Sequence, residues 1–241
     1  MTADWLSPIP VLGLGFALGL KHALDADHLA AVSTIVSERK SLWSSSLVGV
    51  FWGIGHTLSL LVAGVAVIFL HVEMGERLAL GLELAVAAML VGLGLSTLHK
   101  LGRGAQLHMH AHEHGGRLHV HPHVHDDEPL REPHAHHNLR FGARPLLVGV
   151  VHGLAGSAAV MLLVLSAIPS PALGMAYIGV FGVGTVGGML VMSVLMGLPA
   201  HLTAASFAFA HLAVRSLAGC FSLGLGLFMV YDIGFVRGLL R

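Results

Sequence analysis

The chain has 241 residues, of which 55% are hydrophobic and 11% are charged, and its mean hydropathy is +0.79. Soluble domains carry about 25% charged residues, so this composition predicts a polytopic integral membrane protein and excludes an ordinary soluble domain. The formal net charge is zero, so the composition shows no sign of a nucleic-acid-binding protein, and a single cysteine excludes an intramolecular disulfide or a paired-thiol redox mechanism.

Six apolar segments are long enough to cross a hydrocarbon core, which takes about 20 residues of helix. They cover residues 8–36, 45–70, 78–99, 145–168, 172–198 and 207–236. We therefore expect an all-α membrane fold of six transmembrane helices, the first of which is long enough to tilt or break. Proline cannot continue a helix, so Pro169, Pro171 and Pro199 are expected in the connections of the second half.

The first segment carries four polar side chains at membrane depth: His22, Asp25, Asp27 and His28. A charged side chain at the centre of a membrane helix costs about 2.5–3.5 kcal/mol, so such residues indicate a ligand, a proton path or an ion pair. On an ideal helix of about 100° per residue, His22, Asp25 and His28 share an arc of about 120°, and Asp27 points almost the opposite way. Either Asp27 supports the site from behind its ligands, or the helix is distorted and Asp27 joins them.

Further histidines lie in other apolar segments. His56, in the middle of the second segment, is expected to add an imidazole, and His152 of the fourth segment is a further candidate metal ligand. Imidazole suits nickel, cobalt, copper and zinc, so we expect a transition-metal site made of His22, Asp25, Asp27, His28 and His56. The alternative is a hydrogen-bonded His–Asp network that binds no metal, and for His152 a bond to a backbone carbonyl.

A histidine-rich segment separates the third and fourth spans. Its histidines are His108, His110, His112, His114, His119, His121, His123, His125, His134, His136 and His137. The segment has no apolar periodicity, so we expect a disordered or weakly ordered loop that captures divalent metal ions. A pH-responsive linker and an incidental low-complexity insert are the alternatives.

The two halves of the chain resemble each other. Three blocks match in order: residues 49–56 with 179–185, 22–24 with 152–154, and 92–95 with 224–227. Each copy holds three spans, and an odd number forces the second copy to insert upside down, as in many transporters. The predicted organisation is a first three-helix repeat over 1–100, a His-rich loop over 101–140 and a second repeat over 141–241.

Basic residues set the expected orientation. They are Arg39 and Lys40 after the first span, and Lys100, Arg103, Arg140 and Arg144 beside the His-rich loop. Because Lys and Arg accumulate in cytoplasmic loops, we expect the His-rich loop in the cytoplasm and both termini outside. The expected location is a bacterial plasma (inner) membrane.

The motif His22-x4-Asp27-His28 resembles the signature of the nickel/cobalt transporter family, and Gly53-Ile54-Gly55-His56-Thr57 is similar to its second motif. The resemblance implies a role for Asp27 in transport and therefore favours a distorted helix. Lys21 stands where the family usually has Arg. Residues 152–158 stand where an acidic motif is expected, and this pattern resembles the short six-span branch linked to urease maturation.

These observations predict a non-enzymatic secondary permease for Ni²⁺ or Co²⁺, with the ion as cargo and no prosthetic group. Expected partners are the divalent ion and the lipid bilayer, with no nucleic acid; a homo-oligomer and a metallochaperone at the loop stay open. The alternatives are an exporter with the same site, an intramembrane metalloenzyme, and a metal sensor or storage protein that uses the loop alone. No His-Glu-x-x-His or Gly-x-Ser-x-Gly motif supports an enzyme.

Overall fold

The structure, a computed structural model, describes residues 8–39, 41–72, 75–104, 107–114, 117–124, 140–155, 168, 170–204 and 208–240. The helices are α1 (Pro8–His22), α2 (Ala26–Ser37), α3 (Leu42–Leu70), α4 (Glu76–Gly104), α5 (Arg140–Leu154), α7 (Pro171–Ala204) and α8 (Ala208–Tyr231), which runs into the π-helix η2 (Asp232–Val236). Two strands, β1 (Leu107–His114) and β2 (Arg117–Val124), complete the described elements.

Four of these helices, α3, α4, α7 and α8, are long and apolar enough to cross a membrane. Helices α1 and α2 form a fifth crossing if the pair, bent by 55°, is counted as one broken span. Many large apolar side chains are exposed on the described surface, for example Val62, Leu217 and Phe209, as expected for contact with lipid. The chain is thus a helical membrane protein, and five of the six predicted spans correspond to observed helices. The predicted span 145–168 lies partly outside the described residues.

Local sequence explains where several helices begin. The Ser41 hydroxyl accepts a hydrogen bond from the Ser44 N–H (3.1 Å) and so caps α3. Ser170 precedes α7, whose first residue is Pro171, a position where the missing proline N–H costs nothing. The expectation that Pro199 lies in a connection is wrong, because α7 continues past it to Ala204. Pro199 sits in the last turns, where only a short stretch of helix follows the missing hydrogen bond.

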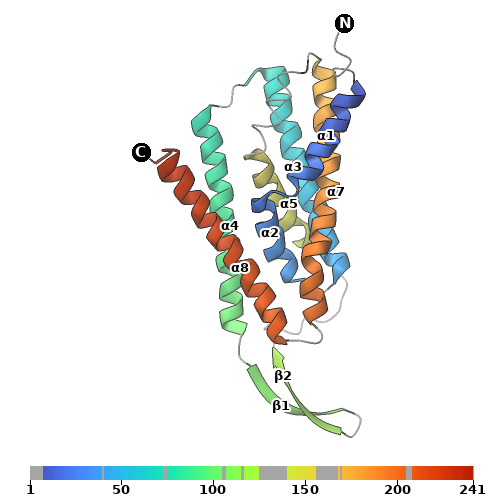
Figure 1. The fold of residues 1–241 in the computed structure, drawn as a ribbon, viewed down its shortest axis with the longest axis vertical. Coiled ribbons are helices and arrows are strands. Elements are labelled where there is room, and N and C mark those ends of the chain that lie inside the picture. The colour runs from blue at the N-terminus through green and yellow to red at the C-terminus, as the bar shows by residue number, and fades with distance from the viewer. Residues whose placement is uncertain are drawn as a thin grey trace.

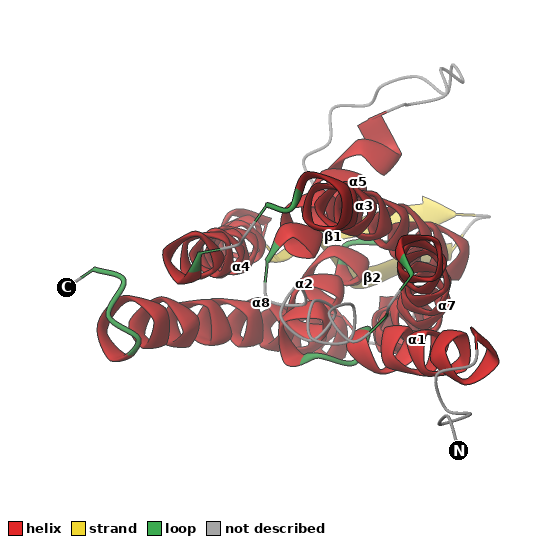
Figure 2. Ribbon diagram, turned by 90° about the horizontal axis from the view of Figure 1, so that it is seen from above, coloured by secondary structure: helices red, strands yellow, loops and turns green. Residues whose placement is uncertain are grey.

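The helices enclose α2, which lies at the centre of the molecule (Figures 1 and 2). Helix α3 packs between α5 and α7, α1 packs on α7, and α4 pairs with α8. Helix α2 contacts α3, α4, α7 and α8, and its residues Ala30, Ala31, Val32 and Val36 are fully buried. The core of the protein is therefore built around a short helix that starts in the middle of the bundle.

Glycines allow the close contacts between the helices of opposite halves. A Cβ atom at Gly19 of α1 would collide with the carbonyl oxygen of Phe181 on α7. In the corresponding part of the second half, a Cβ atom at Gly149 of α5 would collide with the carbonyl oxygen of Trp52 on α3. Small residues of this kind let membrane helices approach where lipid provides no hydrophobic force between them.

The same kind of glycine contact occurs in both directions between α4 and α8. Gly94 of α4 lies against the backbone at Gly219 of α8, and Gly226 of α8 lies against the backbone at Ala87 of α4. The two glycines belong to the matching blocks 92–95 and 224–227. Close glycine contacts between helices of the two halves therefore involve glycines of both halves.

The His-rich segment differs from its prediction. In place of a disordered or weakly ordered loop, β1 and β2 form an antiparallel two-stranded sheet that pairs His108 with His123 and His112 with His119. The alternating His-x-His spacing has the period of two that suits a strand, and the intervening sequence Gly115-Gly116 favours a two-residue hairpin turn. His125, His134, His136 and His137 lie outside the described residues.

A polar cluster ties three helices together at the hairpin end. The Lys100 ammonium of α4 donates to Glu38, the residue that ends α2 (2.8 and 3.0 Å), and the Arg144 guanidinium of α5 lies 3.8 Å from the same carboxylate. The Glu38 side chain is only 18% exposed. The basic residues near the first connection and near the His-rich segment therefore share one side of the protein, as predicted.

We predict that Gly149→Ala destabilises the fold, because the added methyl group meets backbone atoms of α3 and forces α3 and α5 apart. Overpacking of this kind costs about 1–3 kcal/mol. The matched control is Gly179→Ala, since Gly179 is also helical and a Cβ there has no neighbour within 4 Å. Thermal unfolding in detergent should show a lower Tm for the first variant and an unchanged or slightly higher Tm for the second. Equal Tm values would contradict the close α3–α5 contact.

Candidate metal centre

The candidate site begins with the interruption between α1 and α2. Helix α1 ends at His22, and two tight turns follow, in which the N–H of Leu24 donates to Lys21 (2.9 Å) and the N–H of Asp25 donates to His22 (3.1 Å). Asp25 is extended, with φ −62° and ψ 144°, and α2 starts directly after it. The distortion of the first span, which one of the two alternatives requires, is therefore observed.

The turn brings Asp25 back onto the last residue of α1. Its Oδ2 lies 2.7 Å from Nδ1 of His22, and the Asp25 side chain is half exposed. A carboxylate only accepts hydrogen bonds, so Nδ1 of His22 carries the proton. The other ring nitrogen, Nε2 of His22, is buried and has no hydrogen-bond partner among the described residues. Asp25 thus leaves a lone pair on Nε2 that faces the interior.

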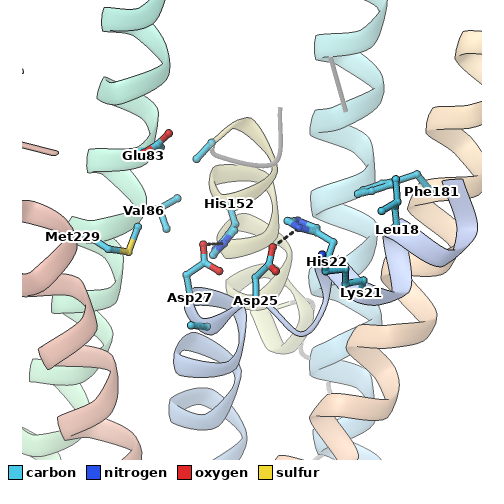
Figure 3. A pocket seen from close by; sticks show the side chains of 12 residues that line it. Leu18, Lys21, His22, Asp25, Asp27, Glu83, Val86, His152, Phe181 and Met229 are labelled. Carbon is cyan, nitrogen blue, oxygen red and sulfur yellow. Dashed lines mark hydrogen bonds and ion pairs between the residues drawn. The ribbon is translucent and has the colours of Figure 1, made fainter. Parts of the chain in front are cut away.

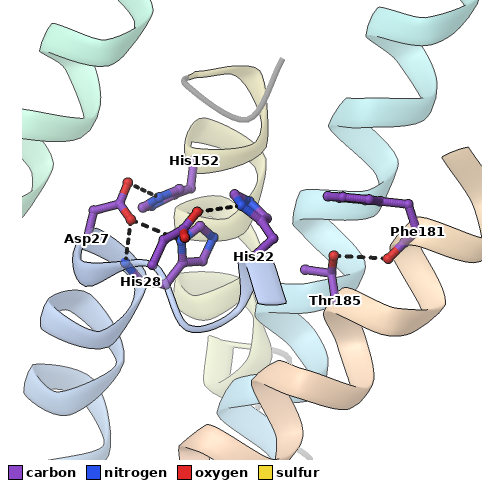
Figure 4. A network of polar contacts seen from close by, with 7 residues as sticks. His22, Asp27, His28, His152, Phe181 and Thr185 are labelled. Atoms are coloured by element: carbon purple, nitrogen blue, oxygen red, sulfur yellow. Dashed lines mark hydrogen bonds and ion pairs between the residues drawn. The ribbon is translucent and has the colours of Figure 1, made fainter. Parts of the chain in front are cut away.

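Asp27 holds two further imidazoles, one from each half of the chain (Figure 4). Its Oδ1 accepts from the N–H of His28 (2.9 Å) and lies 3.1 Å from Nδ1 of that ring, and its Oδ2 lies 2.9 Å from Nε2 of His152 on α5. By the same argument, His28 keeps a lone pair on Nε2 and His152 keeps one on Nδ1. Both of these atoms are buried and lack a hydrogen-bond partner within the described ranges.

His56 of α3 supplies the third imidazole of the first half. The residue is fully buried, and its ring centroid lies 4.9 Å from that of His22 and 5.4 Å from that of His28. Neither of its nitrogens has a hydrogen-bond partner in the described part of the chain. Buried polar atoms nearly always find a partner, so a group of unpartnered nitrogens is typical of a site that takes a ligand.

Among the described residues, two sets of three are close enough to hold one metal ion each. The first set is His22, His28 and His56, and the second is Asp27, His28 and His152; within each set one ligand atom per residue lies within 4.8 Å of the others. Carboxylates that orient ligating imidazoles are the usual support of a metal centre. All six residues predicted for the site, Asp25 included, thus converge on one region.

The described residues of the second half offer no equivalent group. Thr185 occupies the place that corresponds to His56, and its hydroxyl donates to the carbonyl oxygen of Phe181 (3.0 Å) instead of facing the imidazoles (Figure 4). His152 is the residue of α5 that reaches the centre, where it contacts Asp27.

A cavity of about 530 Å³ reaches the centre from one side (Figure 3). His22, Asp25, Asp27 and His152 line one wall, and residues of α4 and α8 such as Glu83 line the other. In Figure 3, Glu83 lies above the imidazoles, so the cavity extends toward the end of the bundle opposite the hairpin. A hydrated divalent ion fits easily in a space of this size.

Sequence reasoning missed two features of this region. Glu83 was not included among the predicted site residues, yet it lines the cavity and pairs with Arg237 of the C-terminal segment. Glu38 was not singled out at all, although it ends α2 and joins it to α4 and α5. Only the helix break, which makes Glu38 the end of a short inner helix, could have pointed to it.

The fold and the centre define a helical membrane protein with a buried cluster of histidines and aspartates. A search of curated proteins finds 38% identity over 238 residues with the urease accessory protein UreH of Bacillus sp. (strain TB-90), covering 99% of this chain and 98% of that protein. The chain therefore belongs to the UreH family of urease accessory proteins. No protein-family model matches the chain, and no solved structure matches it.

We predict that the Asp27–His152 contact couples the two halves. In a double-mutant cycle of thermal stability with Asp27→Asn and His152→Gln, the coupling energy should be about 0.5–3 kcal/mol, as for residues in direct contact. The control cycle pairs Asp27→Asn with His201→Gln, an exposed histidine near the end of α7. Its two effects should add to within about 0.5 kcal/mol. Strict additivity in both cycles would contradict the contact.

Proposed function

We propose that the protein is a permease for Ni²⁺, with Co²⁺ as a second cargo, and that it is not an enzyme. The single observation that carries this proposal is the set of buried, unpartnered nitrogens of His22, His28 and His56 at the end of a cavity. Three imidazoles replace part of the water shell of the ion, and Asp25 and Asp27 offset its charge. An imidazole-rich site suits Ni²⁺ and Co²⁺.

The similarity to UreH supports Ni²⁺ as the cargo. UreH is named as a urease accessory protein, and urease needs nickel, so a membrane protein of this family would supply the metal by carrying Ni²⁺ into the cell. The lone cysteine, Cys220, is exposed and lies outside the cluster. Without a thiolate in the centre, softer ions gain no preference.

The backbone around the centre also favours a cation. The C-terminal end of α1, which carries the negative end of the helix dipole, stops at His22. The N-terminal end of α2 carries the opposite sign, but Asp25 and Asp27 stand at its first turn and compensate for it. Broken helices with such ends are how secondary transporters bind ions near the midplane.

Transport would follow from alternating access of two inverted three-helix repeats. The reciprocal glycine contacts between α1 and α7, α3 and α5, and α4 and α8 support this symmetry. The cavity lies on one side of the centre, and the Glu38–Lys100–Arg144 cluster joins α2, α4 and α5 on the other. In this proposal the cluster closes the hairpin side, which is the cytoplasmic side, while the cavity admits the ion.

The hairpin stays a proposed capture site for the same ions, through its alternating histidines. Neutral imidazole is the ligand, so capture should weaken as the pH falls through about 6.5. An exporter differs only in the sign of the flux. A sensor or storage protein that uses the hairpin alone would not need the buried centre.

We predict that His22→Ala and His56→Ala each lower Ni²⁺ uptake into proteoliposomes at least tenfold, because each removes one of three ligands. The control is His201→Ala, which removes an exposed histidine outside the centre and should leave uptake unchanged. Uptake at the wild-type rate in both site variants would rule out this centre as the path. Ni²⁺-dependent release from cells, with the opposite sign, would favour the exporter.

We also predict that Lys100→Gln weakens closure on the hairpin side. Lys100 is half exposed, so its pair with Glu38 contributes about 0.2–1 kcal/mol and its loss shifts the conformational equilibrium at most about fivefold. The measurement is labelling of a thiol introduced by Met229→Cys in the cavity wall, in a Cys220→Ser background, with an impermeant maleimide applied from each side.

Labelling from the hairpin side should increase with Lys100→Gln. It should not change with the matched control Arg103→Gln, which removes an exposed charge from the same turn region of α4. An equal increase in both variants would show that general charge, and not this ion pair, controls access.

A further inference from the structure

The two sets of possible metal ligands share one residue and differ in where the others come from. His28 belongs to both sets. The first set adds His22 at the end of α1 and His56 of α3, so it lies entirely within the first half of the chain. The second set adds Asp27 and His152 of α5, so it bridges the two halves.

The sets also differ in their contact with the cavity. Asp27 and His152 both line the cavity, and the Asp27 side chain is 28% exposed. In the first set only His22, 11% exposed, reaches the cavity wall, and His28 and His56 are fully buried. An ion that arrives through the cavity therefore meets the carboxylates of Asp25 and Asp27 and the exposed edge of His22 before it meets the fully buried rings of His28 and His56.

Ring positions allow a direct transfer between the sets. The ring centroid of His28 lies 4.0 Å from that of His152 on one side and 4.5 Å from that of His22 on the other. Its Nδ1 faces Asp27, and its Nε2 is the buried nitrogen without a partner among the described residues. One imidazole thus offers a nitrogen to each set.

We propose that the transported cation occupies two successive positions: an outer position at Asp27, His28 and His152, and an inner position at His22, His28 and His56. The proposal rests on the transport function above and adds the order of binding and the role of His152. At the outer position the ion takes the place of the two ring protons that now point at Asp27. His28 and His152 therefore become the opposite tautomers, with the proton on Nε2 of His28 and on Nδ1 of His152. Transfer to the inner position reverses this exchange at His28 and releases α5 from the ion.

Two positions explain why a histidine of the second half is present at all. An ion at the outer position is held by both halves at once, whereas an ion at the inner position is held by the first half alone. The relative position of the halves is therefore coupled to the place of the ion. In a single merged site, both halves would hold the ion throughout and no step would separate them.

The binding test uses the full-length protein in lipid nanodiscs and records the Tm shift caused by NiCl₂, since a ligand of the folded state raises Tm. His56→Gln removes an inner ligand and should reduce the Tm shift without abolishing it. Adding His152→Gln should abolish the Tm shift that remains. The glutamine amide still donates to Asp27, which keeps the structural hydrogen bond. A His56→Gln variant with a shift already equal to that of the double variant would overturn the outer position.

The flux test uses proteoliposomes that enclose a nickel-quenched dye. His152→Gln alone should keep the Tm shift of the inner position but lower the initial uptake rate about tenfold or more. His201→Gln, the exposed control, should change neither quantity. If the Tm shift of His152→Gln falls to that of the double variant, the protein has one merged site and the proposal is overturned. An uptake rate of His152→Gln equal to that of the wild type would also overturn it.

A third variant separates ligation from a structural role. His152→Cys cannot reproduce the ring N–H bond but offers a thiolate, which favours softer ions. Flux of Zn²⁺ relative to Ni²⁺ should rise severalfold in this variant, and an unchanged ratio would contradict ligation by residue 152. If the wild type carries no ion, the transport function fails, and the residual Tm shift in His56→Gln still decides whether the outer position exists.

Discussion

The interruption of the first span is the constraint on which the rest of the structure depends. A straight helix would turn Asp27 away from His22 and His28, and a membrane offers no water to the backbone groups that a break sets free. Here the N–H groups of Leu24 and Asp25 bond within the two tight turns, and that of His28 donates to Asp27. The break lies inside the bundle, where α3, α4, α7 and α8 surround α2. The surrounding helices lower the energetic cost of the break, and the break brings Asp27, His22 and His28 together.

The centre separates two roles that a list of histidines and aspartates would merge. Asp25 and Asp27 accept hydrogen bonds from ring N–H groups, and this fixes which nitrogen of each imidazole keeps its lone pair. The ligand atoms of His22 and His28 lie within 4.8 Å of one another and of a nitrogen of His56, which has no carboxylate partner among the described residues. A carboxylate that orients an imidazole also places a negative charge near the ion, so each aspartate acts twice.

Packing and chemistry follow different rules in the two halves. Helix contacts are reciprocal, as Gly94 and Gly226 show, but Thr185 stands opposite His56 and bonds to its own helix. A repeat can lose its ligands without losing its contacts, because close helix packing needs only small residues at the crossing points. Among the described residues of the second half, His152 is the imidazole that contacts the centre.

The sequence predicted much of this and failed where distant elements meet. Apolar length located α3, α4, α7 and α8, and the polar motif of the first span located the centre, because both signals are local. The contact of Asp27 with His152 and the role of Glu38 depend on how α2 and α5 pack, which no local pattern encodes. The hairpin was missed for another reason: a period of two in histidine was interpreted as chelating composition and not as a strand.

The most direct test of the account is the position of nickel in the protein, measured by anomalous scattering at the nickel edge in crystals of the full chain grown with NiCl₂. The account predicts a peak within bonding distance of His28 in the middle of the bundle, with His22 and His56 as its neighbours. A nickel peak on the hairpin alone, with none between α2 and α3, would contradict it.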